Sequence, residues 1–199
     1  MNSKVMNKLS YGLFVLTAKD GDKDNGCIIN TAAQVTTSPN RIVITVNKDN
    51  YTHDMIMKTK EFNVSILGES AAFATFKHFG FQSGRDTDKF AEITYSRAEN
   101  GIAYIANECN GYISGKVIDT MDLGTHTMFI ADVTGGEVLS DEMSATYAYY
   151  HSNIKTAQKP AEKKGYVCTI CGYIYEGDTL PADFVCPICK HGADDFQPL

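Results

Sequence analysis

Short β-branched segments separated by polar turns are the main pattern along the first three quarters of the chain. The segment RIVITVN (41–47) is almost continuously apolar, and FNVSIL (62–67) alternates apolar and polar positions. Both patterns are typical of β-strands that bury one or both faces. Further strands are predicted at 11–18, 27–36, 112–119 and 126–134, with TGGEVL (134–139) as a turn into a last strand.

Helical patterns are fewer, and they are predicted at 52–59, 69–79 and 143–151. Many short strands with a few helices between them predict a mostly-β barrel or sandwich with inserts. The sequence contains no G-x-G-x-x-G after a strand, no Walker loop, no G-x-S-x-G and no H-E-x-x-H. A nucleotide-like cofactor would therefore bind without a Rossmann or P-loop motif.

A polar cluster follows the strand at 41–47 and leads into a predicted helix. Asn47, Lys48 and Thr52 stand in this cluster. Backbone N–H groups at a helix start, beside a lysine and a hydroxyl, form a natural phosphate cradle. The same residues also suit a simple turn with Asn50 or Thr52 as the N-cap. The residues alone leave both interpretations open.

Two other places carry polar residues inside predicted strands. Asn30, Thr31 and Gln34 are small and polar, which suits a flat heterocycle with donors and acceptors on its rim. His126 opens an alternating strand, where a surface role and a role beside a ligand both fit.

The order of these motifs resembles the flavin reductase-like, split β-barrel FMN-binding family. The shared motifs are GCIINT, the segment from QVT to TH, FNVSIL and GTHTMFIADV. The resemblance implies that the isoalloxazine ring is contacted by Asn30, Thr31, Ala32 and Gln34. It implies that the ribityl phosphate is held by Val46, Asn47, Lys48, Thr52 and His53. His126 would lie near the flavin and nicotinamide rings as the catalytic residue.

The segment FGFQSGRDTDKF (79–90) matches a loop that borders the flavin in this resemblance. Arg85 there would meet a carboxylate or phosphate, or would pair with Asp86 or Asp88. The resemblance also implies FMN as the cofactor, NADH or NADPH as the substrate, and a homodimer.

Four of the six cysteines form two C-x-x-C pairs, separated by fourteen residues: Cys168, Cys171, Cys186 and Cys189. Each pair is typical of a tight turn that points both sulfurs at one metal ion. A segment this short cannot form an adequate core, so the metal is expected to contribute folding energy. Cys27 and Cys109 are isolated and are predicted to be small buried apolar residues.

Spacing does not separate a zinc ribbon from an iron site, because tetrahedral thiolate ligands serve both metals. The neighbours YVCTICGYIY, LPADFVCPICK and DDF resemble rubredoxin, which implies an Fe(Cys)₄ centre. The resemblance implies an aromatic core of Tyr166, Tyr173, Tyr175, Phe184 and Phe196. Lys190 stands where a second glycine is usual, and a left-handed conformation there would cost roughly 1 kcal/mol.

The segment SNIKTAQKPAEKK (152–164) is polar, lysine-rich and contains a proline, which predicts a flexible linker. It divides the chain into a split β-barrel flavin reductase-like domain (1–151) and a small metal-stapled rubredoxin-like domain (165–199). The net charge of −6 argues against nucleic-acid binding. No apolar run is long enough to span a membrane. The amino terminus lacks a secretion signal, so we expect a cytoplasmic protein.

The combination of the two domains resembles the high-molecular-weight rubredoxins of anaerobic bacteria. It implies electron flow from NADH or NADPH through FMN and iron to a flavodiiron-type protein that reduces oxygen or nitric oxide. Two alternatives stay open. One is an electron carrier without nicotinamide activity, and the other is an FMN-binding protein whose zinc ribbon is a docking module.

Overall fold

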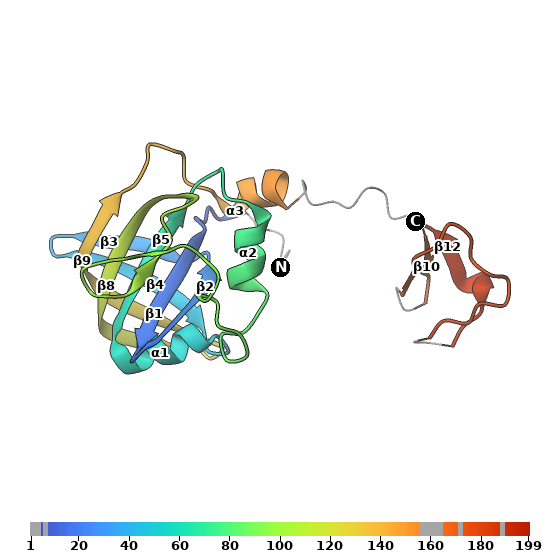
Figure 1. The fold of residues 1–199 in the computed structure, drawn as a ribbon, viewed down its shortest axis with the longest axis horizontal. Coiled ribbons are helices and arrows are strands. Elements are labelled where there is room, and N and C mark those ends of the chain that lie inside the picture. The colour runs from blue at the N-terminus through green and yellow to red at the C-terminus, as the bar shows by residue number, and fades with distance from the viewer. Residues whose placement is uncertain (1–4, 6–7, 156–164, 171–172, 188–189) are drawn as a thin grey trace. The chain divides into compact units, whose positions relative to one another are not determined.

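An antiparallel seven-stranded sheet forms the first of two units, Met1–Thr156 and Ala157–Leu199, in this computed structural model (Figure 1). The structure describes residues 5, 8–155, 165–170, 173–187 and 190–199. The strands are β1 (Phe14–Asp20), β2 (Lys23–Ile29), β3 (Ala32–Thr37), β4 (Asn40–Asn47), β5 (Glu61–Leu67), β8 (Cys109–Asp122) and β9 (His126–Val138). Their order is β2-β1-β5-β8-β9-β4-β3, so β2 and β3 are the two edges.

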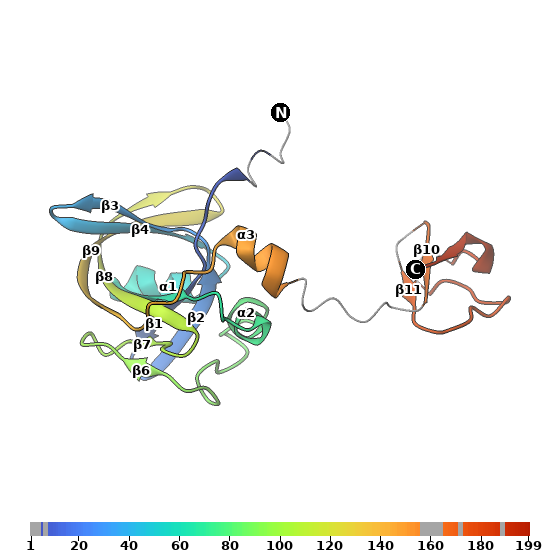
Figure 2. The ribbon, with the colours of Figure 1, turned by 90° about the horizontal axis from the view of Figure 1, so that it is seen from above.

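The sheet curls into an open barrel, and the β3–β4 hairpin extends away from it in both views (Figures 1 and 2). A small second sheet pairs β6 (Ser96–Arg97) with β7 (Ala103–Tyr104). The prediction of a mostly-β barrel with a few helices is confirmed.

Helical segments accompany the barrel. They are α1 (Tyr51–Thr59), α2 (Phe73–Gly80), and α3 (Tyr147–Tyr149) with the π-helix η2 (Tyr150–Ile154). Met55 and Ile56 of α1 are buried in the barrel core. Within the described part of the chain, no helix is both long and apolar enough to cross a membrane.

The alternation of side chains along β4 decides which residues face outward. Ile42, Ile44 and Val46 are buried in the core, together with Phe62 and Phe129 from the facing strands. The alternate positions of β4, from Arg41 to Asn47, are only half-buried on the outer face. Because strand side chains alternate with period two, burying the aliphatic set turns Thr45 and Asn47 outward.

Two predicted strand boundaries are wrong. The predicted strand 27–36 breaks at Asn30 and Thr31, where the chain passes from edge β2 to edge β3. Residues 134–138 of TGGEVL are part of β9 and not a turn, because β9 continues its pairing with the long strand β8 as far as Val138. Gly136 permits this pairing, since a Cβ there would lie 2.7 Å from the carbonyl oxygen of Tyr112.

The predicted linker also begins too early. Residues 152–154 belong to η2, and Ile154 is buried in a core cluster with Tyr150 and Phe76. The lysine-rich composition of 152–164 predicted a linker throughout, although the buried Ile154 lies near its start. The remainder of that segment, from 156 to 164, lies outside the described residues.

The second unit contains a three-stranded sheet in the order β11-β10-β12. Its strands are β10 (Tyr166–Cys168), β11 (Ile174–Tyr175) and β12 (Phe196–Pro198). The ring of Phe184 lies 4.7 Å from that of Tyr175, 5.4 Å from that of Phe196 and 6.4 Å from that of Tyr173, measured between centroids. Four of the five predicted aromatic residues thus pack together, and Tyr166 pairs with Tyr175 in the sheet.

Lys190 adopts the left-handed conformation that its position predicted, with φ of 64°. Its N–H donates to the carbonyl oxygen of Cys186 at 3.0 Å. Only glycine adopts this conformation without a steric cost from Cβ.

Replacing Lys190 by glycine should therefore stabilise the second unit by about 1 kcal/mol. The measurement is the urea midpoint at which the metal–thiolate absorbance of the full chain disappears. Lys190→Ala is the matched control, because it removes the charge but keeps Cβ, and its midpoint should not rise. Equal midpoints for the glycine and alanine variants would contradict a steric cost of the Cβ at position 190.

Candidate functional site

The end of β4 that leads into α1 brings together three of the predicted site residues. Asn47 pairs directly with His126 across β4 and β9. The N–H of Lys48 donates to the carbonyl oxygen of Thr125 at 3.0 Å. The side-chain oxygen of Asn47 accepts the N–H of Asp49 at 2.9 Å, which shapes the turn into the helix. Asn47, Lys48 and His126 are thus held in one place by strand pairing.

Thr31 lies beside the same strand. Its hydroxyl donates to the carbonyl oxygen of Thr45 at 3.0 Å, and its own carbonyl accepts the Thr45 N–H at 3.1 Å. Thr45 is two residues before Asn47 on the outer face, a separation of about 7 Å. The predicted ring contacts therefore meet the predicted phosphate contacts along β4.

A pocket of about 240 Å³ opens beside Thr31. It is lined by Ser10, Tyr11, Gly12, Asn30, Thr31, Ala32, Ala33, Val43 and Thr45. The half-buried side-chain amide of Asn30 forms no hydrogen bond with any described residue, so it offers both a donor and an acceptor to a ligand. We call this the Asn30 pocket.

A second pocket, of about 260 Å³, opens at the start of α1. It is lined by Asn25, Cys27, Asp49, Asn50, Tyr51, Thr52, Gly80, Phe81, Gln82, Ser83, Gly84 and Lys89. The first N–H groups of a helix have no partner within the helix and carry a partial positive charge. The loop 80–84 closes the pocket, and it approaches so closely that a Cβ on Gly84 would overlap the Asn25 side chain. We call this the α1 pocket.

Lys89 places a positive charge in the wall of the α1 pocket. It is 3% exposed, and its ammonium group donates to the carbonyl oxygens of Gly26 (2.8 Å) and Phe79 (2.9 Å). Burial lowers its pKa. Neither Lys89 nor its neighbours Asn25 and Ser83 was predicted, although Lys89 belongs to the DKF motif of the segment 79–90.

Three predicted phosphate contacts have side chains that are buried inside the protein. Val46 and Thr52 are fully buried, and the hydroxyl of Thr52 accepts a hydrogen bond from the Asn25 amide at 3.0 Å. His53 is buried with Nε2 2.9 Å from the Thr127 hydroxyl. Val46 lies before the helix, and the N–H of His53 already donates to the carbonyl oxygen of Asn50 at 3.0 Å. Of these three residues, Thr52 is therefore the one whose backbone N–H can reach a ligand at the helix start.

Cys27 lies beside Thr52, and burial raises the pKa of its thiol to about 11. Burial likewise raises the pKa of Cys109 to about 12. Both thiols are 4% exposed, which confirms the prediction that they are small buried apolar residues.

Arg85 pairs with a residue that the sequence did not indicate. Its guanidinium group donates to Asp54 at 2.6 Å, rather than pairing with Asp86 or Asp88. The hydrogen bond from Arg85 lowers the pKa of Asp54, whose other oxygen lies 3.2 Å from Nδ1 of His53. The pair fastens the loop over the α1 pocket to α1 itself.

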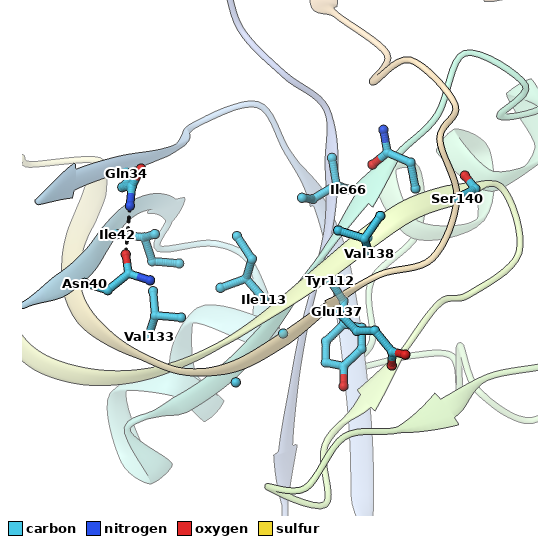
Figure 3. A pocket seen from close by; sticks show the side chains of 14 residues that line it. Gln34, Asn40, Ile42, Ile66, Tyr112, Ile113, Val133, Glu137, Val138 and Ser140 are labelled. Carbon is cyan, nitrogen blue, oxygen red and sulfur yellow. Dashed lines mark hydrogen bonds between the residues drawn. The ribbon is translucent and has the colours of Figure 1, made fainter. Parts of the chain in front are cut away.

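Gln34 lies apart from the other predicted contacts. Its amide donates to the Asn40 side chain at 2.8 Å in a groove of about 720 Å³ (Figure 3). It pairs with Ile42, five residues before Asn47, so the two lie about 17 Å apart. The groove is mainly aliphatic and carries the carboxylate of Glu137, which disfavours a phosphate.

The ammonium group of Lys48 also points away from both pockets. It donates to Asp122 at 2.7 Å, at the turn between β8 and β9. Its backbone, and not its side chain, is what the structure fixes at the end of β4.

Two of the predicted metal ligands are described, and both are buried. Cys168 is 1% exposed and Cys186 is fully buried. The N–H of Cys186 donates to the carbonyl oxygen of His191 at 2.8 Å. Cys171 and Cys189 lie outside the described residues. Buried thiols from both C-x-x-C segments fit a metal ion bound by four thiolates. Zinc and iron both accept this set of ligands.

Comparison with known families gives two matches along the chain. Residues 6–158 match the family described as "Flavin reductase like domain", and residues 166–197 match "Rubrerythrin, rubredoxin-like domain". Over 229 aligned positions the chain is 37% identical to a high molecular weight rubredoxin of Moorella thermoacetica, with 100% of both chains covered. It is 32% identical to a ferric-chelate reductase (NAD(P)H) of Archaeoglobus fulgidus, over 76% of this chain and 89% of that protein.

A solved structure with the same fold is an NADH:FAD oxidoreductase of Streptomyces globisporus. The two superpose with a TM-score of 0.65 at 22% identity, over 72% of this chain and 84% of that one. At 22% identity, this similarity shows a shared fold.

The buried contact between Asn25 and Thr52 gives a test of which side chains hold the α1 pocket together. Thr52→Val keeps the shape but leaves the Asn25 amide without its acceptor, so it should lower the free energy of unfolding by about 1–3 kcal/mol. Thr45→Val is the control on the outer face, and its effect should stay within about 0.5 kcal/mol. Urea unfolding measures both, and equal stabilities would contradict this role of Thr52.

Proposed function

Because the chain belongs to the flavin reductase like domain family through residues 6–158, we propose that it is an FMN-dependent oxidoreductase. It takes electrons from NADH or NADPH and passes them to an Fe(Cys)₄ centre in the second unit. That centre hands them to a flavodiiron-type acceptor protein. The rubredoxin-like match over 166–197 supports the iron centre. The similarity to a ferric-chelate reductase (NAD(P)H) supports NADH or NADPH as the electron source. The similarity to a high molecular weight rubredoxin over the full chain supports the combination of the two units.

The observation that supports the proposal is a pair of separate pockets, one beside the last residues of β4 and one at the start of α1. The Asn30 pocket includes Thr45, the α1 pocket includes Asn50, and the outward residue Asn47 stands between them in the chain. FMN carries a flat heterocycle at one end and a phosphate at the other. The small polar pocket and the positively polarised pocket match these two ends.

The α1 pocket would hold the phosphate. The first backbone N–H groups of α1 point along the helix axis, and a phosphate there interacts favourably with the helix dipole. Lys89 adds a buried ammonium group whose third N–H is not used by Gly26 or Phe79. Arg85 holds the covering loop closed through Asp54.

The Asn30 pocket would hold the ring. The amide of Asn30 can pair with the alternating carbonyl and N–H groups of a flavin pyrimidine edge. His126 stands opposite Asn47, and its Nδ1 lies 2.9 Å from the Thr125 hydroxyl. Its Nε2 has no hydrogen-bond partner among the described residues, so this nitrogen is the one that a ligand would meet.

Bound FMN would supply the exchange between the electron pair of a hydride and single electrons. The second unit would accept them at an iron held by Cys168, Cys171, Cys186 and Cys189. The apolar rings around Phe184 exclude water from such a centre, and this exclusion is one of the factors that set its reduction potential.

We also propose that the protein is a cytoplasmic homodimer. Met121 pairs with Met128 across β8 and β9, and Ile130 lies on the same outer face. Met121 is 52% exposed in the single chain. Apolar side chains on an exposed sheet face suit a contact with a second copy.

Anaerobic stopped-flow absorbance tests the electron path. Mixing the FMN- and iron-loaded chain with NADH or NADPH should bleach the flavin band first and the thiolate-to-iron band afterwards. Cys186→Ser should abolish the iron band and leave flavin bleaching intact. Failure of both nicotinamides to bleach the flavin would contradict the reductase and favour an electron carrier. A colourless zinc-loaded second unit from the natural host would contradict the iron relay.

The Ser83 side chain gives a test of the phosphate position. Its hydroxyl accepts the N–H of Arg85 at 3.1 Å, and aspartate can replace it as acceptor while adding a negative charge. Ser83→Asp should weaken FMN binding about tenfold or more, which corresponds to about 1.4 kcal/mol. Ser83→Asn is the uncharged control. Riboflavin, which lacks the phosphate, should bind both variants equally, and an equal loss for FMN and riboflavin would place the phosphate elsewhere.

A further inference from the structure

Tyr11 lies beside the predicted ring contacts, although nothing in the sequence pattern indicated it. It precedes β1, and together with Ser10 and Gly12 it lines the Asn30 pocket. We propose that Tyr11 forms the aromatic wall of the isoalloxazine site, as a positioning residue in contact with the flavin ring. This inference rests on the proposed function.

The backbone is fixed at the carbonyl of Tyr11 and at the next residue, Gly12. Its carbonyl oxygen accepts the N–H of Tyr147 at 2.8 Å, and Gly12 forms a bridge with Thr146. A Cβ on Gly12 would overlap the ring of Phe14, so the chain passes directly over that core side chain. The Cα of Tyr11 is therefore held at the edge of the pocket.

The ring of Tyr11 is also supported from the side. It meets the ring of Tyr147 edge-on, with centroids 6.2 Å apart and planes at 84°. Tyr147 in turn meets His151 at 4.5 Å, and Tyr150 packs against Phe76 at 4.6 Å. The wall of the Asn30 pocket thus rests on α3 and η2, which are anchored in the core. A supported ring loses little conformational entropy when a flat ligand binds against it.

Contact between a phenol and a flavin has a spectroscopic signature. A photoexcited flavin takes one electron from a tyrosine ring in contact with it, and the electron returns to the tyrosine in the dark. No net chemistry occurs, but the fluorescence of the flavin is quenched. Phenylalanine is much harder to oxidise and does not quench, whereas tryptophan does. Substituting Tyr11 by phenylalanine therefore keeps the packing against Tyr147 and removes only the electron donor.

The experiment measures the fluorescence yield of FMN bound to the full chain. Tyr11→Phe should raise the yield several-fold, and Tyr11→Trp should return it to the wild-type level. Tyr104→Phe is the matched control, because Tyr104 stacks on Tyr112 at 3.9 Å and does not line the Asn30 pocket.

Two negative results have different meanings. If the wild-type chain retains FMN but Tyr11→Phe leaves the yield unchanged, Tyr11 does not contact the ring, and the proposed function stands. If the wild-type chain retains no FMN after gel filtration, the proposed function itself fails and this inference fails with it. A purely structural role of the Tyr11 ring predicts equal yields for the tyrosine and phenylalanine proteins.

Discussion

The register of β4 against β9 is the constraint on which the proposed flavin site depends. Ile42, Ile44 and Val46 fill the barrel core, so the alternate residues Thr45 and Asn47 must face outward. A shift by one residue would bury polar groups and expose the aliphatic set, which makes other registers costly. The same pairing places His126 opposite Asn47 and brings the chain to the start of α1 at a fixed point. The pairing thus fixes the strand that contributes Val43 and Thr45 to the Asn30 pocket and that leads into the α1 pocket.

Buried polar contacts then hold the helix start against the barrel. Thr52 accepts a hydrogen bond from Asn25, and His53 lies within hydrogen-bond distance of Thr127 and Asp54. An unpaired buried polar group is costly, so these contacts specify one placement of α1. The side chains of Thr52 and His53 were predicted to bind the phosphate. They instead hold the helix start in place, and the backbone N–H groups there would contact the ligand.

Local patterns in the sequence were sufficient for part of this picture. The apolar run at 41–47 predicted β4, the polar turn predicted α1, and the missing glycine at position 190 predicted the left-handed Lys190. Tyr11 and Lys89 reach their pockets through contacts with residues far along the chain, and the Arg85–Asp54 pair joins a loop to a helix. Spacing within a segment carries no information about such contacts. The apolar anchor Ile154 was hidden for a related reason, because a lysine-rich composition outweighed one residue.

We propose that one flavin lies across the outer end of β4, from Tyr11 to the start of α1. A crystal structure of the full chain grown with FMN tests it most directly. We expect phosphate density within hydrogen-bond distance of the Tyr51 and Thr52 N–H groups, and ring density between Tyr11 and Asn30. Flavin density in the groove beside Ile113 and Glu137 would contradict it.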